Sequence, residues 1–175
     1  MNGSATVVRS GCMAKDADMI LSEFILLGIG GKELSEENAA QTAKALNIIQ
    51  PDFIRVHATG IKLESKLGEF VRDGSFTLQS EEEIVIEQKL FLQQLHEMDS
   101  YYVNEHIVNL LLEVRGNLRT EKQEMLSTID RFLTLPPDER LLFTVGRRLN
   151  IFFRLDDLKK PKLHQKAGES LQQIL

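Results

Sequence analysis

The sequence predicts an α/β fold in which a parallel β-α-β unit is followed by a mostly helical C-terminal region. Two apolar runs of strand length, residues 20–27 and 53–58, are nearly continuous, which is typical of strands in a parallel sheet. Between them, residues 35–49 carry apolar side chains at helical spacing. A strand, a helix and a second strand in this order form a parallel, right-handed unit.

A glycine-rich turn separates the first strand from the first helix. The strand runs into Gly28-Ile29-Gly30-Gly31, where glycine permits a tight exit. We expect Ser35 to accept hydrogen bonds from the first helical turn, with two glutamates following it at the positive end of the helix dipole. Pro51 ends this helix, whereas residues 7–18 favour a helix only weakly. The residues expected to face the core are Ala39, Ala43 and Leu46.

The rest of the chain is predicted to be mostly helical. The capping-box sequence Ser80-Glu81-Glu82-Glu83 begins a helix that should reach residue 97. Two more helices are predicted at residues 120–133 and 136–149, the second opened by a pair of prolines, and a frayed helix ends the chain. The first helix of this region should bury Ile84, Phe91 and Leu95. We therefore divide the chain into an α/β part, residues 1–100, and a helical extension, residues 101–175.

The composition indicates one acidic globular chain of 175 residues with a net charge of -5. A nucleic-acid binder would show a basic face, and the basic pair Arg147-Arg148 is explained by a solvated surface. No apolar run approaches the ~18 residues needed to cross a bilayer, and the N-terminus does not resemble a secretory signal. The single cysteine, Cys12, excludes an internal disulfide. We expect a cytoplasmic protein without a nucleic-acid or membrane partner.

The glycine turn matches neither of the common phosphate-binding motifs. A dinucleotide fingerprint would need a third glycine at position 33, where the chain has Glu33. A P-loop would need glycine at position 26 and Ser or Thr at 33, and the chain has Leu26 and Glu33. Glu33 would also repel a phosphate at the helix entrance. Taken alone, these residues favour a structural turn over a ligand loop.

The histidines provide no ready metal site. None of His57, His96, His106 and His164 lies three or four residues from another, so no helix face presents a ligand pair. His57 lies near the C-terminal end of the second strand, where barrel enzymes place working groups. His106 lies in a polar segment that also contains Asn109. From the residues alone, a buried, hydrogen-bonded structural role is favoured for His57 and His106 over a functional one. No nucleophile with a defined partner emerges either.

Several ordered segments together resemble radical S-adenosylmethionine proteins, in the subgroup described only as iron–sulfur oxidoreductases. The first two segments resemble the fifth strand with its helix and the sixth strand of that barrel, and the fourth is similar to the family's Asp-His-x-x-Asn. The last two resemble its C-terminal tail. In chain order the segments are residues 26–37 (LLGIGGKELSEE), 51–56 (PDFIRV), 74–84, 105–109 (EHIVN), 146–149 (GRRL) and 155–158 (LDDL). The likeness therefore assigns the chain to the C-terminal half of such an enzyme.

The resemblance implies a partial (β/α) barrel formed by the last strands of a six-unit barrel. In this family a four-iron four-sulfur cluster bound by three cysteines cleaves S-adenosylmethionine to an adenosyl radical, which abstracts hydrogen from a substrate. The family contacts the adenine from the fifth-strand turn. The resemblance thus assigns cofactor contacts to Gly28, Ile29, Gly30, Gly31 and Glu33. It also favours a substrate-side position, on the concave side where the strands end, for His57, His106 and Asn109.

The departures from the family pattern affect the chemistry. The Cys-x-x-x-Cys-x-x-Cys loop belongs to the first barrel unit, and this chain has one cysteine. We therefore expect no cluster, no other metal and no cofactor on the isolated chain. After the sixth strand the family usually has Pro-Gly-Thr-Pro-Leu, where this chain has Leu63-Glu64-Ser65-Lys66-Leu67. Glu105 replaces the family's aspartate, and Val108 stands where a small polar residue is usual.

Three functions are compatible with these residues. The first is a truncated half of a radical enzyme, without catalysis of its own. The second is a subunit of a split enzyme that completes the active site of a cluster-bearing partner, and the third is an α/β interaction module without a cofactor. We expect a homo-oligomer or a complex with a cluster-bearing N-terminal half, because two strands alone leave an apolar sheet face and a strand edge open. Folding of the C-terminal helices back over the sheet is the alternative to association.

Overall fold

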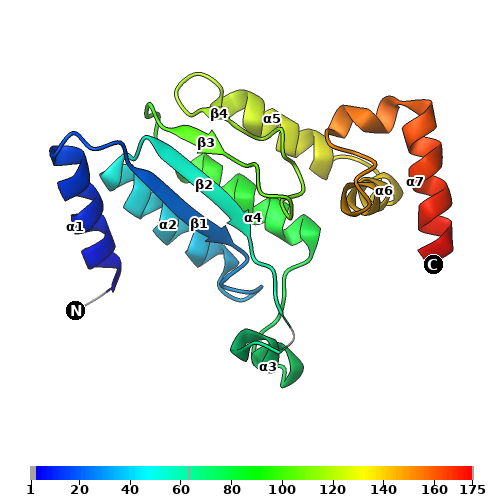
Figure 1. The fold of residues 1–175 in the computed structure, drawn as a ribbon, viewed down its shortest axis with the longest axis horizontal. Coiled ribbons are helices and arrows are strands. Elements are labelled where there is room, and N and C mark those ends of the chain that lie inside the picture. Colours follow the sequence, from blue (N-terminus) through cyan, green and yellow to red (C-terminus); the bar gives the residue numbers. More distant parts are fainter. Residues whose placement is uncertain (1–2, 63, 175) are drawn as a thin grey trace.

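The computed structural model describes residues 3–62 and 64–174 (Figure 1). The predicted β-α-β unit is confirmed, with the helix and the second strand at their predicted bounds. The elements in chain order are α1 (Gly3–Asp16), β1 (Ser22–Leu27), α2 (Ser35–Ile49), β2 (Phe53–Ala58), α3 (Lys66–Arg72), α4 (Glu81–Gln94), β3 (Tyr101–Val103), β4 (Gly116–Asn117), α5 (Lys122–Leu133), α6 (Pro137–Arg148), the 3-10 helix η1 (Leu155–Lys159) and α7 (Pro161–Ile174).

The four strands form one open, mostly parallel sheet in the order β1-β2-β3-β4. β1 and β2 pair in parallel, from Ser22 opposite Phe53 to Leu27 opposite Ala58. β3 continues in parallel beside β2, and β4 is antiparallel to β3. The first strand starts at Ser22 rather than at residue 20, because the preceding residues belong to the connection from α1. The fold class is thus α/β, with an open sheet.

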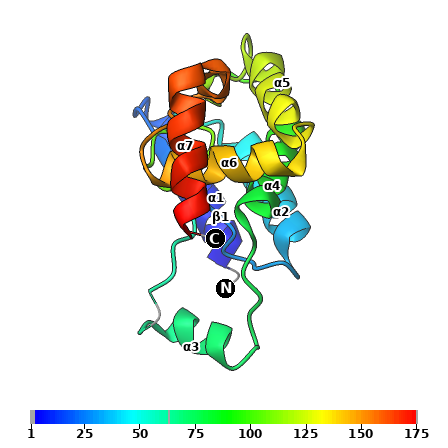
Figure 2. The same ribbon diagram turned by 90° about the vertical axis from the view of Figure 1, so that its right-hand side faces the viewer.

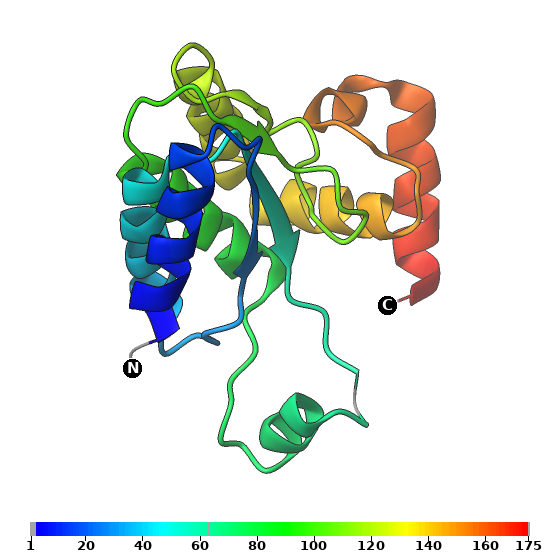
Figure 3. The same cartoon turned by 60° about the vertical axis from the view of Figure 1, so that its left-hand side comes forward.

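Helices α2 and α4 cover one face of the sheet and pack against each other (Figures 1 and 3). Alternate strand residues point into this layer, where Ile25, Leu27, Ile54 and Val56 are buried. The side chains of α2 that were predicted to face the core are all buried there. α1 packs against α2 and is a regular helix, although its sequence favours a helix only weakly. No helix in the described residues is long and apolar enough to cross a membrane.

The opposite face of β1 and β2 is uncovered within the described part of the chain. Phe24 keeps 66% of its surface exposed and Leu26 keeps 40%. Arg55 and His57 lie opposite them on β2 and share this face. Figure 1 looks onto the uncovered face, and the C-terminal helices lie beyond β4 rather than in front of β1 and β2. The C-terminal helices therefore do not fold back over this face of the sheet, which was the alternative to association.

The start of α2 differs from the prediction, whereas the start of α4 agrees with it. Leu34 occupies the N-cap position of α2, and Ser35 is the first helical residue with no capping bond. Its hydroxyl donates to Glu87 instead, at 3.0 Å, so a distant carboxylate replaces the local partner. Ser80 forms the predicted capping box with Glu83. α4 ends at Gln94 rather than at residue 97, and Ile84 is only partly buried, in contrast to Phe91 and Leu95.

The region after residue 100 is mostly helical, but it also extends the sheet. The sequence predicts no strand here, and the structure places β3 and β4 in it. α5 and α6 lie within the predicted ranges 120–133 and 136–149. The last residues form a full helix, α7, rather than a frayed one, because it packs on α6 and η1 (Figure 2). One hydrophobic core runs from Ile25 to Ala167 and includes residues from both parts of the chain.

Candidate functional site

The carboxyl ends of the three parallel strands gather the residues that the sequence analysis singles out. In parallel sheets the loops at this end build ligand sites. The glycine turn, residues 28–31, follows β1; His57 lies near the end of β2; and the segment 104–110 follows β3. Topology therefore brings the predicted cofactor-side and substrate-side residues to the same end of the sheet.

The glycine turn is tight and is tied to the segment before α4. Gly28 and Gly31 have φ angles of +82° and +63°, which side chains rarely tolerate. The amide of Gly31 donates to the carbonyl of Gly28 at 3.2 Å, and the amide of Lys32 donates to the carbonyl of Thr77 at 3.0 Å. A Cβ atom on Gly31 would lie 2.8 Å from the Thr77 carbonyl oxygen. The turn itself thus requires glycine, whatever it binds.

Two side chains of the turn region differ in their availability to a ligand. Ile29 at the tip is 42% exposed and offers apolar surface to a flat group. Glu33 accepts a hydrogen bond from the hydroxyl of Thr77, which lowers the pKa of its carboxyl group. Glu33 is therefore anionic at neutral pH, and the turn favours an uncharged or cationic group over a phosphate.

His57 and His106 stack face to face at the strand ends, with ring centroids 4.2 Å apart and an interplanar angle of 18°. Phe24 meets the His57 ring edge-on, with centroids 5.5 Å apart. Stacked rings direct their nitrogen lone pairs along parallel planes, which does not suit coordination of one shared metal ion. The described residues contain no group of three His, Cys, Asp or Glu side chains that could hold a metal.

The surroundings of the stack favour the uncharged form of His57. Burial lowers the pKa of His57, and the nearby His106 and Arg55 lower it further. Nδ1 of His106 is buried and has no hydrogen-bond partner among the described atoms. The cluster thus combines aromatic surface with one polar atom that the described protein leaves unsatisfied.

Asn109 is occupied by structural hydrogen bonds. Its Oδ1 accepts from the amide of Ala58 at 2.8 Å, and its Nδ2 donates to the carbonyl of Val56 at 2.7 Å and to the side chain of Asn104. Asn104, which the sequence analysis does not single out, donates in turn to the carbonyl of Leu111. These bonds hold the segment 104–110 against the end of β2. They make Asn109 a supporting residue, with little capacity left to contact a substrate.

We expect the stability of the protein to decline with falling pH in part because His57 resists protonation. Its folded-state pKa lies below the unfolded value near 6.5, so the unfolded chain binds more protons as pH falls through that range. The contribution of the neutral His57 to stability is then fully present above about pH 6.5, and it is lost as the pH falls below that value. His57→Gln should make the pH dependence of the free energy of unfolding shallower than in the wild type. Urea denaturation between about pH 5 and pH 8 measures this; equal slopes for wild type and His57→Gln would contradict it.

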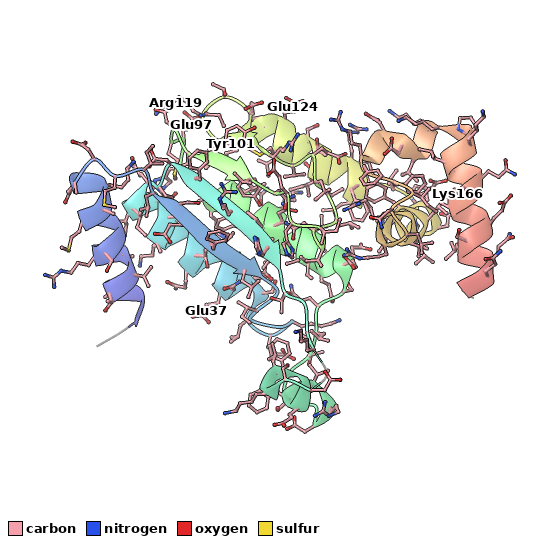
Figure 4. All side chains as sticks on the ribbon, viewed as in Figure 1. Glu37, Glu97, Tyr101, Arg119, Glu124 and Lys166 are labelled. Carbon is pink, nitrogen blue, oxygen red and sulfur yellow. The ribbon has the colours of Figure 1, made fainter. Side chains whose placement is uncertain are left out.

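A second hollow is lined by residues that include Tyr101 of β3 and Glu124 of α5, both labelled in Figure 4. It contains two adjoining cavities of about 420 and 230 Å³. Both are lined by Glu113, Arg115, Glu121 and Arg154. Burial raises the pKa of Glu113, whose Oε1 accepts from a backbone amide of η1. Because arginines and carboxylates alternate around this hollow, its charge selects no class of ligand, and it shares no lining residue with the strand-end site.

Cys12 lies at the wrong end of the sheet for a cluster beside the glycine turn. It is in the second half of α1, where Lys15 pairs with Asp52 at 2.7 Å and Gly11 lies against Ile49. These contacts are at the amino ends of the strands. A four-iron cluster needs several thiolates held together, and the sequence contains one cysteine. The residues of this chain therefore do not fit such a cluster.

No protein-family model matches the sequence, and comparisons with curated proteins and with solved structures find no significant similarity. The class that the fold and the strand ends define is that of an open α/β sheet with a polar and aromatic cluster beside a glycine turn.

Proposed function

We propose that this chain is the C-terminal half of a radical S-adenosylmethionine barrel, without catalysis of its own. The observation that carries the proposal is the open parallel sheet, whose uncovered face ends at the glycine turn and the His57–His106 stack. In the proposed arrangement the sheet supplies the last strands of a partial barrel. The cluster chemistry would require another polypeptide, since Cys12 cannot provide it.

The uncovered face and the free edge of the sheet support the proposal that another polypeptide packs against this chain. Phe24 and Leu26 present apolar surface to water, and β1 has β2 as its only strand partner among the described residues. Exposed apolar surface represents on the order of 25 cal/mol per Å² of unused burial. A free strand edge also offers unpaired backbone groups to another chain. In a complete barrel, preceding units would cover both features.

Helix α3 gives further support for a neighbour at the carboxyl ends of the strands. It stands away from the rest of the protein on two long connections (Figures 1 and 3). It has 7 residues, and an isolated helix of this length is marginal in water. Phe70 on this helix is partly exposed. A partner seated on the open face would meet α3 and the glycine turn together.

The proposed division of roles follows from what each group offers. Ile29 and the peptide groups of the glycine turn would contact the adenosine part of S-adenosylmethionine, and the carboxylate of Glu33 suits its positive charge. His57 and His106 would lie toward the substrate. When bound beside a partner's cluster, S-adenosylmethionine supplies the radical. A split enzyme needs this same arrangement with a dedicated cluster-bearing subunit, whereas an interaction module needs the open face alone.

Titration with S-adenosylmethionine tests the proposed function. We expect the amide signals of residues 28–33 to shift as the ligand is raised to about 5 mM, because half a site should still bind weakly. Ile29→Asp should abolish these shifts. Ile48→Asp is the matched control. It makes the same change at another exposed isoleucine, which lies on α2 and away from the carboxyl ends of the strands. Absence of any shift in the wild-type protein would refute adenosine binding and favour the interaction module.

We also expect the chain to associate through its uncovered face. Light scattering across a concentration series should show a mass above that of the monomer, because apolar surface on β1 is buried in the complex. Phe24→Asp should shift the protein toward the monomer, whereas Ile48→Asp should not. A compact wild-type monomer that persists at low micromolar concentration and melts cooperatively would contradict this expectation.

A further inference from the structure

A fully buried carboxylate lies directly beneath the glycine turn. Glu87 of α4 is 0% exposed. Its Oε1 accepts from the amide of Gly28 at 3.2 Å and from Nδ2 of Asn38 at 2.7 Å, while its Oε2 accepts from the hydroxyl of Ser35 at 3.0 Å. The three donors come from the turn and from the first helical turn of α2. One side chain of α4 therefore joins two segments that are distant from it in sequence.

This carboxylate has no cationic partner among the residues that the structure describes. None of the ion pairs among the described residues involves Glu87. A buried carboxylate has lost its hydration and needs hydrogen bonds from the protein in its place. What an apolar residue cannot do is accept three hydrogen bonds at fixed positions. The three bonds thus fix the positions of the Gly28 amide, Ser35 and Asn38 relative to α4.

The hydrogen-bond network around Glu87 also includes Gln79 and the end of β1. Nε2 of Gln79 donates to the Ser35 oxygen at 2.8 Å, so the Ser35 proton is directed to Glu87. Asn38 also donates to the carbonyl of Leu26 at 3.2 Å, which ties the end of β1 into the same network. Each of the described groups that hydrogen-bonds to the Glu87 carboxyl group acts as a donor to it.

We propose that Glu87 is the positioning residue of the glycine turn: it holds the Gly28 amide, and through it the tip at Ile29, in the conformation that receives a nucleoside. The amide of Gly28 points inward to Glu87, while its carbonyl accepts from Gly31 and closes the turn. Both ends of the turn are then fixed before any ligand arrives. The nucleoside part of this inference rests on the proposed function; the positioning of the turn does not.

Glu87→Gln tests the inference, because it keeps the size of the side chain and replaces one acceptor oxygen with a donor. Amide hydrogen exchange should become about tenfold faster at Gly28 and Gly31, while amides of β2 and β3 keep their rates. The affinity for S-adenosylmethionine should fall by a similar factor. Glu82→Gln is the matched control, since it alters a half-exposed glutamate of the same helix that pairs with Arg140.

The outcomes separate the inference from the proposed function. Unchanged exchange at Gly28 and Gly31, or equal acceleration at every amide, would overturn the role of Glu87. Faster exchange confined to the turn, in a protein that binds no S-adenosylmethionine, would uphold the positioning role and refute the proposed ligand. If Glu87→Gln does not fold, Ser35→Ala removes one donor and should accelerate exchange at the turn about threefold; no acceleration there would overturn the inference.

Discussion

Replacing Gly146 with alanine is expected to destabilise the protein by about 3 kcal/mol. A Cβ atom at this position of α6 would lie 2.2 Å from Cδ2 and 2.5 Å from Cε2 of Phe152. Phe152 cannot move aside easily, because it is fully buried and stacked on Phe143 with ring centroids 6.0 Å apart. The helix propensity gained by replacing glycine, about 1 kcal/mol, does not offset this overlap.

Gly168→Ala provides the control for Gly146→Ala. Gly168 lies in α7, and a Cβ atom there would meet nothing within 4 Å. The same chemical change should therefore stabilise the protein, by up to about 1 kcal/mol. Urea denaturation of both variants measures the difference. A Gly146→Ala variant as stable as the wild type would show that α6 and the Phe152 segment can separate without cost.

The elements that could be predicted from the sequence are those with local signals. The helix Ser35–Ile49 and the strand Phe53–Ala58 carry their own patterns, Pro51 lies between them, and both were predicted at their observed bounds. Ser80 and Glu83 are three residues apart, so their capping box is also local. Ser35 has the same cap-forming chemistry, but its hydroxyl bonds to Glu87, which no local pattern reveals.

The strands β3 and β4 could not be predicted because their stability comes from pairing rather than from pattern. β3 has 3 residues, Tyr101–Val103, and β4 has 2. Runs this short are too brief to show the alternation of apolar and polar residues that distinguishes a strand from a loop. Tyr102 is fully buried, and its pKa is raised because of that burial. Its position is fixed by the neighbouring Ile54 of β2.

The candidate site was predictable only in part, for the same reason. The glycine turn is visible in the sequence because its conformation needs glycine at two positions. The partnership of His57 with His106 and the support of Gly28 by Glu87 join residues that are far apart in the chain. Asn109 was predicted to lie on the substrate side, and the bonds of its amide to the backbone of β2 could not be read from the sequence. Polarity in the sequence thus located the region, and the structure distinguishes its supporting groups from its available ones.

Arg147→Met is expected to destabilise the protein by about 3–4 kcal/mol, because Arg147 joins the C-terminal helices to the segment that carries Asn109. Only 2% of Arg147 is exposed, so the prediction that the Arg147-Arg148 pair belongs to a solvated surface is wrong for Arg147. Its guanidinium donates to the carbonyls of Leu110 at 3.0 Å, Phe152 at 3.1 Å and Asn109 at 3.1 Å. Burial lowers its pKa, but an arginine remains charged at neutral pH. Methionine would fill much of the volume and leave three buried carbonyl groups without their donor.

The neighbouring Arg148 makes this prediction specific to the buried guanidinium. Arg148 pairs with Glu81 at the surface and donates to the carbonyl of Val108 at 2.9 Å, so Arg148→Met should cost about 1 kcal/mol or less. Urea denaturation of the two variants gives the stability difference, and the ring signals of His106 report whether the segment beside Asn109 has moved. The His106 signals should shift in Arg147→Met and stay near their wild-type positions in Arg148→Met. Equal stability losses would mean that α6 is held by its apolar face, and that Arg147 has no special part in supporting the strand-end site.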